Sequence, residues 1–212
     1  MKSNPIQNAI AQVHNLGGQK SVLTEIELLK LGIDQLTLNK LVDLEILYPC
    51  AEGIYMPDNA DFGEHHTRVE VAARFPDTVI CLNNALNFHN LTTQWGEGWI
   101  AYKQGTSIPV EPKLPIQPVA MNEPGFSRGI ETHMIEGLPV KVYNIPKTVA
   151  DCFIYEDIVG ADVSEEAFID CIYYKRASMS EILFYLEDYT LKWYTEQNLI
   201  RCIQQVSEMV VI

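Results

Sequence analysis

A Glu-x-Lys pair comes nearest to catalytic chemistry in this sequence. Glu111 and Lys113 have the form of a nuclease metal site, and Glu70 or Asp77 could supply a second acid for a divalent cation. The pair lies in a Pro-rich loop rather than at the end of a strand. We therefore expect it to be a surface segment without a catalytic role.

Histidine and cysteine residues supply the other candidates for chemistry. His65 and His66 follow Glu64, but adjacent side chains point in different directions and no second ligand pair stands at zinc-like spacing. Asp151 and Cys152 could act as an orienting acid and a nucleophile, yet no His is locally paired with them and Cys152 falls near the apolar face of a helix. A solvated linker and a buried thiol are the expected outcomes.

The remaining sequence offers no motif of an enzyme. His89 and His133 stand in apolar surroundings, which is typical of core or turn histidines. There is no Gly-rich phosphate loop, no Gly-x-Ser-x-Gly and no paired Cys motif, and the five cysteines look like small buried hydrophobes. We expect a protein that is not an enzyme, with no catalytic residue, no metal and no cofactor.

The clearest structural pattern is a pair of helices joined by a tight turn. Apolar residues recur at helical spacing over 24–31, Gly32 breaks this helix, and Asp34 can cap the next one. A helix over 5–16 precedes them and ends at Gly17-Gly18. The order is that of a helix-turn-helix.

A β-hairpin is expected directly after the second helix of the pair. Residues 46–48 and 53–56 are β-rich, and 49–52 separate them, with Gly53 supplying special backbone geometry. This hairpin would be the wing of a winged helix-turn-helix, whose second helix reads DNA.

Five polar residues are the candidate DNA contacts. The exposed face of the reading helix carries side chains that can touch bases or phosphates, and a lysine at the start of the motif can reach a phosphate. These residues are Gln35, Thr37, Asn39, Lys40 and Lys20. Residues 1–58 hold four basic and seven acidic residues, a net charge of −3, so any DNA binding should be weak or multimeric.

The whole chain is strongly acidic. Its net charge is −13 at 212 residues, which argues against general nucleic-acid coating and anionic membranes and favours a basic protein partner. Residues 144–212 hold five basic and twelve acidic residues, a net charge of −7. No signal peptide or membrane-spanning run is apparent, so we expect a cytoplasmic protein that does not bind membranes.

We expect an α+β chain with two domains. The winged helix-turn-helix occupies 1–58, and 59–212 form a mixed α/β domain that ends in helices. Residues 78–82 are a strand with Asn83 capping the next helix, and short β runs between 98 and 143 make a small sheet with Gly137 in its last turn. Helices begin at Pro146, at Ser164, at a Ser178–Glu181 capping box and near Leu191.

The C-terminal helices carry more aromatic residues than a single stripe holds. Aromatic residues at helical spacing are usually core, but eight of them fall within about forty residues between 164 and 206. A protein-binding face or a homodimer surface is therefore the competing interpretation.

Four stretches together resemble the AbiEi-type antitoxins of type IV toxin-antitoxin systems, a family of bacterial winged-helix transcriptional regulators. They are the wing ending in 52–55, the strand and helix of 79–92, the runs 129–133 and 139–143, and the signature 146–153 with Lys147, Thr148, Asp151 and Cys152. The resemblance spans roughly residues 18–193, most of the chain.

The resemblance implies a first domain that binds operator DNA and represses its own operon, and a second domain that counteracts a cognate nucleotidyltransferase toxin. The wing tip, residues 49–52, lacks the Arg residues usual in the family. Two alternatives stay open: a protein-interaction module whose winged helix no longer binds DNA, and a nuclease-like enzyme.

Overall fold

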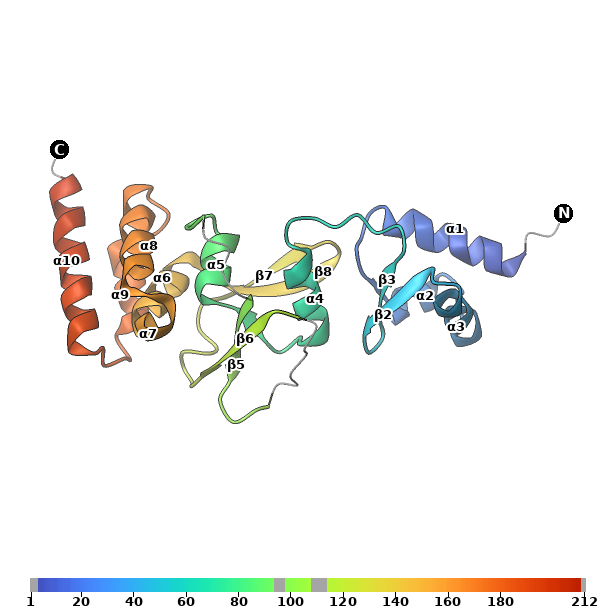
Figure 1. Cartoon of the computed structure of the whole chain (residues 1–212), viewed down its shortest axis with the longest axis horizontal. Coiled ribbons are helices and arrows are strands. Elements are labelled where there is room, and N and C mark those ends of the chain that lie inside the picture. Colours follow the sequence, from blue (N-terminus) through green and yellow to red (C-terminus); the bar gives the residue numbers. More distant parts are fainter. Residues whose placement is uncertain (1–3, 94–97, 108–113, 211–212) are drawn as a thin grey trace. The chain divides into compact units, whose positions relative to one another are not determined.

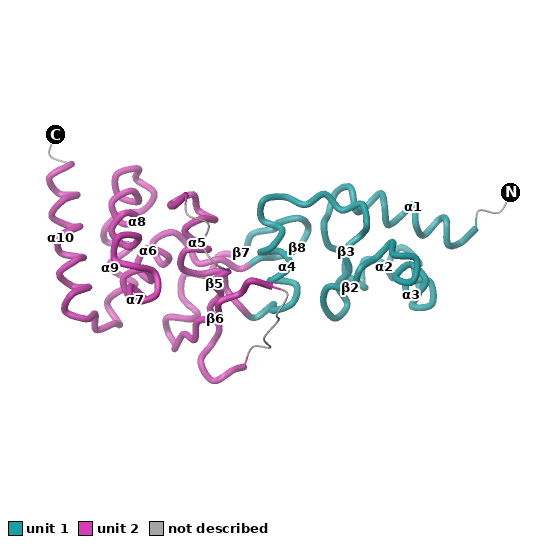
Figure 2. The backbone as a smooth tube through the Cα atoms, viewed as in Figure 1, with its two compact units in different colours: residues 1–77, 133–140 teal, residues 78–132, 141–212 magenta. Residues whose placement is uncertain are grey.

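The computed structural model describes residues 4–93, 98–107 and 114–210, and it has the α+β fold class expected from the sequence. N-terminal helices with a small antiparallel sheet precede a mixed five-stranded sheet and a group of C-terminal helices (Figure 1). Two compact units divide the chain: residues 1–77 with 133–140, and residues 78–132 with 141–212 (Figure 2).

The first unit contains the expected winged helix-turn-helix. Each helix begins at a side chain that accepts a backbone N–H: Asn4, Thr24 in a capping box with Glu27, and Asp34. The helices are α1 (Pro5–Gly17), α2 (Glu25–Lys30) and α3 (Gln35–Asp43), and the sheet order is β1 (Leu23–Thr24), β3 (Ile54–Pro57), β2 (Leu47–Ala51).

The wing differs from the prediction in the length of its first strand. Residues 49–51 were expected in the turn, but they continue β2, and only Glu52 and Gly53 turn the chain. Because β2 is an edge strand, Pro49 can occupy it without removing an N–H from the interior of the sheet, and a bulge at Cys50 absorbs the irregularity. Gly53 has a positive φ of 66°, as expected from its place in the turn.

The segment after the wing stays with the first unit. Asn59 donates to the carbonyl of His14 at 2.8 Å, and helix α4 (His66–Arg74) follows. The first compact unit therefore extends to Asp77, whereas the division into domains 1–58 and 59–212 stays a prediction.

The five-stranded sheet has the order β6-β5-β4-β8-β7. Strand β4 pairs antiparallel with β5 and parallel with β8, while β5 and β6 are parallel. The strands are β4 (Val79–Ile80), β5 (Gly98–Lys103), β6 (Ile116–Met121), β7 (Ile130–Ile135) and β8 (Leu138–Tyr143). The expected short β runs are confirmed, and Gly137 turns the last hairpin with φ 85°.

Six helices in the described part of the second unit pack around one core. Side chains from β4, β5, β6 and β8 meet apolar residues of α5, α6, α7, α8, α9 and α10. The helices are α5 (Leu82–Phe88), α6 (Ile145–Ile154), α7 (Glu156–Val159), α8 (Ala161–Tyr173), α9 (Met179–Leu186) and α10 (Trp193–Val210). The Ser178–Glu181 capping box is confirmed.

Two expected helix caps are wrong. Helix α8 begins at Ala161 after Gly160, whose φ is 96°, so Ser164 lies inside the helix and donates to the carbonyl of Cys152 at 2.8 Å. Helix α5 begins at Leu82, so Asn83 lies in its first turn rather than at its cap. None of the helices in the described ranges is long and apolar enough to span a membrane.

Candidate functional site

The candidate reading helix presents most of its expected contact residues to solvent. Gln35, Asn39 and Lys40 are exposed on α3, and Thr37 is half-buried. The side-chain amide of Gln35 donates to Asn39 Oδ1 at 3.1 Å, so these two residues already form a pair on one helix face. The structure thus brings four of the five expected residues together.

Two of the five candidates also support the fold of the motif. The Lys20 ammonium pairs with Glu27, the residue that closes the capping box of α2. Burial would raise the pKa of Glu27, but hydrogen bonds from Lys20 and Thr24 lower it overall. Thr37 donates to Asp34 at the cap of α3 and holds the pKa of that carboxyl below its ordinary value. The Lys20 ammonium is therefore paired with Glu27 of the same unit, and Lys20 is not part of the group of candidate contacts on α3.

Large apolar side chains share the surface of the winged helix. Leu36 on α3 is 66% exposed and Ile26 on α2 is 65% exposed. Further exposed apolar residues of this unit are Leu29, Leu31, Leu44 and Tyr48. Leu36 stands on α3 among the candidate DNA contacts, and exposed apolar side chains of this kind are typical of protein contacts.

A carboxylate at the tip of the β7–β8 hairpin is hydrogen-bonded to several residues of the first unit. Glu136 accepts hydrogen bonds from the Ser21 hydroxyl and from the Gly63 N–H at 2.8 Å, and its Oε2 lies 3.1 Å from His66 Nδ1. The Phe62 ring lies 4.0 Å from the His66 ring, centroid to centroid. We call Glu136, Ser21, Gly63 and His66 the Glu136 clasp.

Of the two adjacent histidines, His66 contacts Glu136 in the clasp, and His65 contacts Arg68. Arg68 Nη1 lies 2.7 Å from His65 Nδ1, and burial together with this guanidinium lowers the pKa of His65. No signal in the sequence identified Glu136, because its partners lie between 70 and 115 positions away along the chain.

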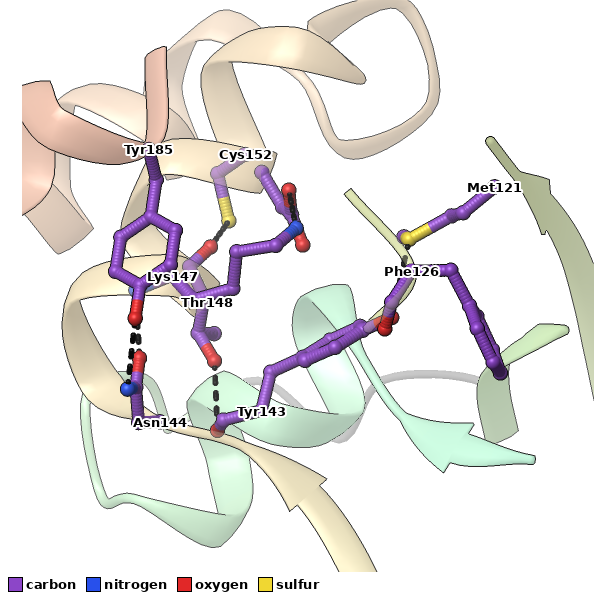
Figure 3. Close-up of polar contacts among 9 residues, drawn as sticks. Met121, Phe126, Tyr143, Asn144, Lys147, Thr148, Cys152 and Tyr185 are labelled. Atoms are coloured by element: carbon purple, nitrogen blue, oxygen red, sulfur yellow. Dashed lines mark hydrogen bonds and ion pairs between the residues drawn. The ribbon is translucent and has the colours of Figure 1, made fainter. Parts of the chain in front are cut away.

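The signature helix α6 contains a fully buried ion pair. Lys147 and Asp151 lie one turn apart with exposed side-chain fractions of 1% and 0%, and the Lys147 ammonium lies 4.6 Å from the centre of the Tyr143 ring (Figure 3). Burial raises the pKa of Asp151 against the attraction of Lys147. Its Oδ2 has no hydrogen-bond partner in the described ranges.

The other polar residues of the signature bind backbone. The Thr148 hydroxyl donates to the carbonyl of Tyr143 at 3.1 Å, and the Cys152 thiol donates to the carbonyl of Thr148 at 3.2 Å (Figure 3). Burial raises the pKa of Cys152, so this thiol is a poor nucleophile. The expected burial of Cys152 is confirmed, and the signature positions α6 against strand β8.

The candidate nuclease pair lies outside the described residues. Glu111 and Lys113 fall within 108–113, while Asp77 is exposed and Glu70 forms an ion pair with Arg74 at 2.8 Å. Among the residues that the structure describes, no three His, Cys, Asp or Glu side chains form a potential metal site.

The aromatic surplus of the C-terminal helices divides between core and surface. Phe168 is fully buried, whereas Trp193 is 75% exposed. Tyr173, Tyr174, Phe184 and Tyr194 are also exposed. The expectation that some aromatic side chains fall outside the core stripe is therefore confirmed.

These features define an α+β protein with an N-terminal winged helix-turn-helix, a mixed five-stranded sheet and C-terminal helices. The crystal structure of the Rv2827c protein from Mycobacterium tuberculosis is similar over 94% of this chain and 76% of that chain, with a TM-score of 0.63 and 9% sequence identity. At this identity the similarity concerns the fold. No family model and no curated protein matches the chain.

Proposed function

We propose that this protein is an AbiEi-type antitoxin and transcriptional autoregulator, which binds its operator through the winged helix and counteracts a cognate nucleotidyltransferase toxin. The observation that carries the proposal is the exposed group Gln35, Asn39 and Lys40 on the second helix of a complete winged helix-turn-helix. The four family-like stretches and the fold shared with Rv2827c support it.

A charge reversal on the reading helix tests the DNA-binding half. Lys40→Glu should weaken binding to the DNA upstream of the gene, because it replaces an attraction to phosphate by repulsion. Lys30→Glu on α2 is the matched control, since it makes the same change at another exposed lysine of the unit. Electrophoretic mobility shifts at several salt concentrations measure both. Equal affinity of Lys40→Glu and the wild type would show that α3 is not the reading face.

A second candidate function, a protein-interaction module, is favoured by the exposed Leu36 and Ile26. The two functions differ in their dependence on salt. An operator-binding protein has an affinity that falls steeply with salt concentration, whereas a module that no longer binds DNA has no measurable affinity at any salt concentration.

The proposal includes the absence of enzymatic activity. Its support is the role of the polar signature residues, which bind backbone or one another in the core. Metal-dependent cleavage of plasmid DNA that is abolished by Glu111→Ala would contradict it.

A further inference from the structure

An open groove lies between α10 and the segment of α7 and the start of α8 in the second unit. It has a volume of about 570 Å³. Its lining includes Trp193, Gln197, Ile200 and Gln204 of α10, with Ala161 and Glu156 on the opposite wall.

Besides Tyr194, Asn198 and Arg201, which form a neighbouring row, the α10 lining contains one stripe of the helix: Trp193, Gln197, Ile200 and Gln204. Their spacing of four, three and four residues places them on a single face. The opposite face packs into the core through Leu199, Cys202 and Val206. Trp193 is 75% exposed and Ile200 is 42% exposed, so the groove offers two apolar anchors about two turns apart.

A buried polar network fixes the shape of the groove. Glu156 accepts hydrogen bonds from the Thr195 hydroxyl and from the Asn198 amide at 2.7 Å, and Arg201 donates to Asn198 Oδ1 at 2.8 Å. Helix α10 packs along α8 (Figure 1). The groove is therefore formed before any partner binds, which lowers the ordering cost of binding.

The charges around the groove are predominantly negative. Arg201, which lines the groove, forms an ion pair with Glu165 at 2.6 Å, and Lys192, which precedes Trp193, forms an ion pair with Asp157. Asp162 and Glu196 are exposed acids that stand next to the lining residues Ala161 and Gln197 in the sequence. Glu166 and Glu208 are exposed acids about one turn beyond the lining residues Ala161 and Gln204 on the same two helices. None of the four forms an ion pair within the part of the chain that the structure describes. A cationic partner would neutralise these acids, whereas a second copy of the chain would add its own.

We propose that this groove binds a basic amphipathic helix of a partner protein. An apolar side chain of that helix occupies the space between Trp193 and Ile200, and its Lys or Arg side chains face the acidic rim. The exposed indole also offers a π-face to a cation. The place of this contact in toxin neutralisation rests on the proposed function, which it deepens by naming the surface and the chemistry of the partner.

Peptide binding to the full-length protein tests the groove. The probe is a fluorescein-labelled peptide of about 16 residues, built from Lys, Ala and Leu with its leucines on one helical face. A peptide of the same composition, with its leucines spread around the helix, controls for simple attraction to an acidic protein. Fluorescence anisotropy gives the Kd of each.

Substitutions in the groove should weaken binding of the amphipathic peptide by about tenfold or more. Trp193→Ala removes one anchor, and Gln204→Lys adds a repelling charge without touching the core. Tyr173→Ala is the matched control, because Tyr173 is an aromatic side chain 63% exposed on α8 and outside the groove lining. Its Kd should equal that of the wild type.

Three results would overturn the proposal. The first is a Kd for the amphipathic peptide that is unchanged in both Trp193→Ala and Gln204→Lys. The second is equal binding of the amphipathic peptide and the control peptide of the same composition. The third is a wild-type dimer, measured by sedimentation equilibrium, that Trp193→Ala dissociates. The last result would assign the groove to a second copy of the chain. Circular dichroism of each variant confirms that it is folded.

Growth rescue separates this inference from the proposed function. The full-length protein is co-expressed with the nucleotidyltransferase toxin that the proposed function predicts in the neighbouring gene. Failure of the wild type to rescue growth would refute the antitoxin function and with it the neutralisation role of the groove. Rescue by the wild type and equally by Gln204→Lys would refute the groove alone.

Discussion

Replacing Lys147 should destabilise the second unit strongly, because the Asp151 carboxyl would be left in the core without a counter-charge. Both side chains are at most 1% exposed, and Asp151 Oδ2 has no other hydrogen-bond partner in the described ranges. Removing one member of a buried pair typically costs about 3–5 kcal/mol of unfolding free energy. For a chain of this size that corresponds to a fall in Tm of roughly 6–20 °C.

The double variant Lys147→Met/Asp151→Leu should recover most of this loss. Apolar residues of similar volume need no partner in the core, and replacing a whole buried pair is often neutral or stabilising. Urea unfolding of the wild type, both single variants and the double variant gives the coupling free energy of the pair. Additive losses in the double variant, or single losses below about 1 kcal/mol, would refute a buried ion pair.

The free energy of unfolding of Lys147→Met, measured as a function of pH, provides a second test of the buried ion pair. Burial raises the pKa of Asp151 in the folded protein above its ordinary value. Asp151 therefore binds its proton more tightly in the folded protein than in the unfolded chain, where its pKa is about 4. The free energy of unfolding consequently falls as the pH rises from about 4 through the pKa that Asp151 has in the folded protein. Loss of the Lys147 attraction raises the folded pKa further. Lys147→Met should therefore approach the wild type in stability as the pH falls toward 4.

Three further predictions concern the first unit and the separation of the two surfaces. Glu136→Gln should reduce the free energy of unfolding by about 1–3 kcal/mol and speed hydrogen exchange in 133–140, because the clasp loses its charge; unchanged exchange would refute its role. The pKa of Asp34 is lower in the folded protein than in the unfolded chain, where it is about 4, so the ionised Asp34 stabilises the fold above about pH 4 and this stabilisation is lost on acidification. The Tm of Asp34→Asn should therefore fall less than the Tm of the wild type below about pH 4. Lys40→Glu should lose operator binding but keep growth rescue, and Gln204→Lys should do the reverse; joint loss in either variant would refute the division of labour.

The sequence predicted elements where local chemistry decides the structure. Helix caps at Asp34 and Ser178, the glycine turns at Gly53 and Gly137, and the short β runs all depend on residues close together in the chain. The wrong cap at Ser164 has a tertiary cause, since its hydroxyl binds the carbonyl of Cys152, twelve positions away on another helix.

The groove and the clasp escaped prediction because they depend on contacts between distant segments. Glu136 meets Ser21, Gly63 and His66 only once the hairpin tip lies in the first unit. Strand β1, two residues long, is too short to leave a pattern in the sequence. The surplus of aromatic residues signalled an exposed face, but the sequence could not say that Trp193 and Ile200 would line it.

The buried pair changes where function should be sought in this chain. Lys147, Thr148 and Asp151 are polar residues of the signature 146–153, and such residues usually suggest an active site. Here they join α6 to strand β8 and to one another, with no space for a substrate. The resemblance in this stretch is therefore one of architecture. Under the proposed function, specificity for an operator or a toxin would come from exposed residues outside it, on α3 and in the α10 groove.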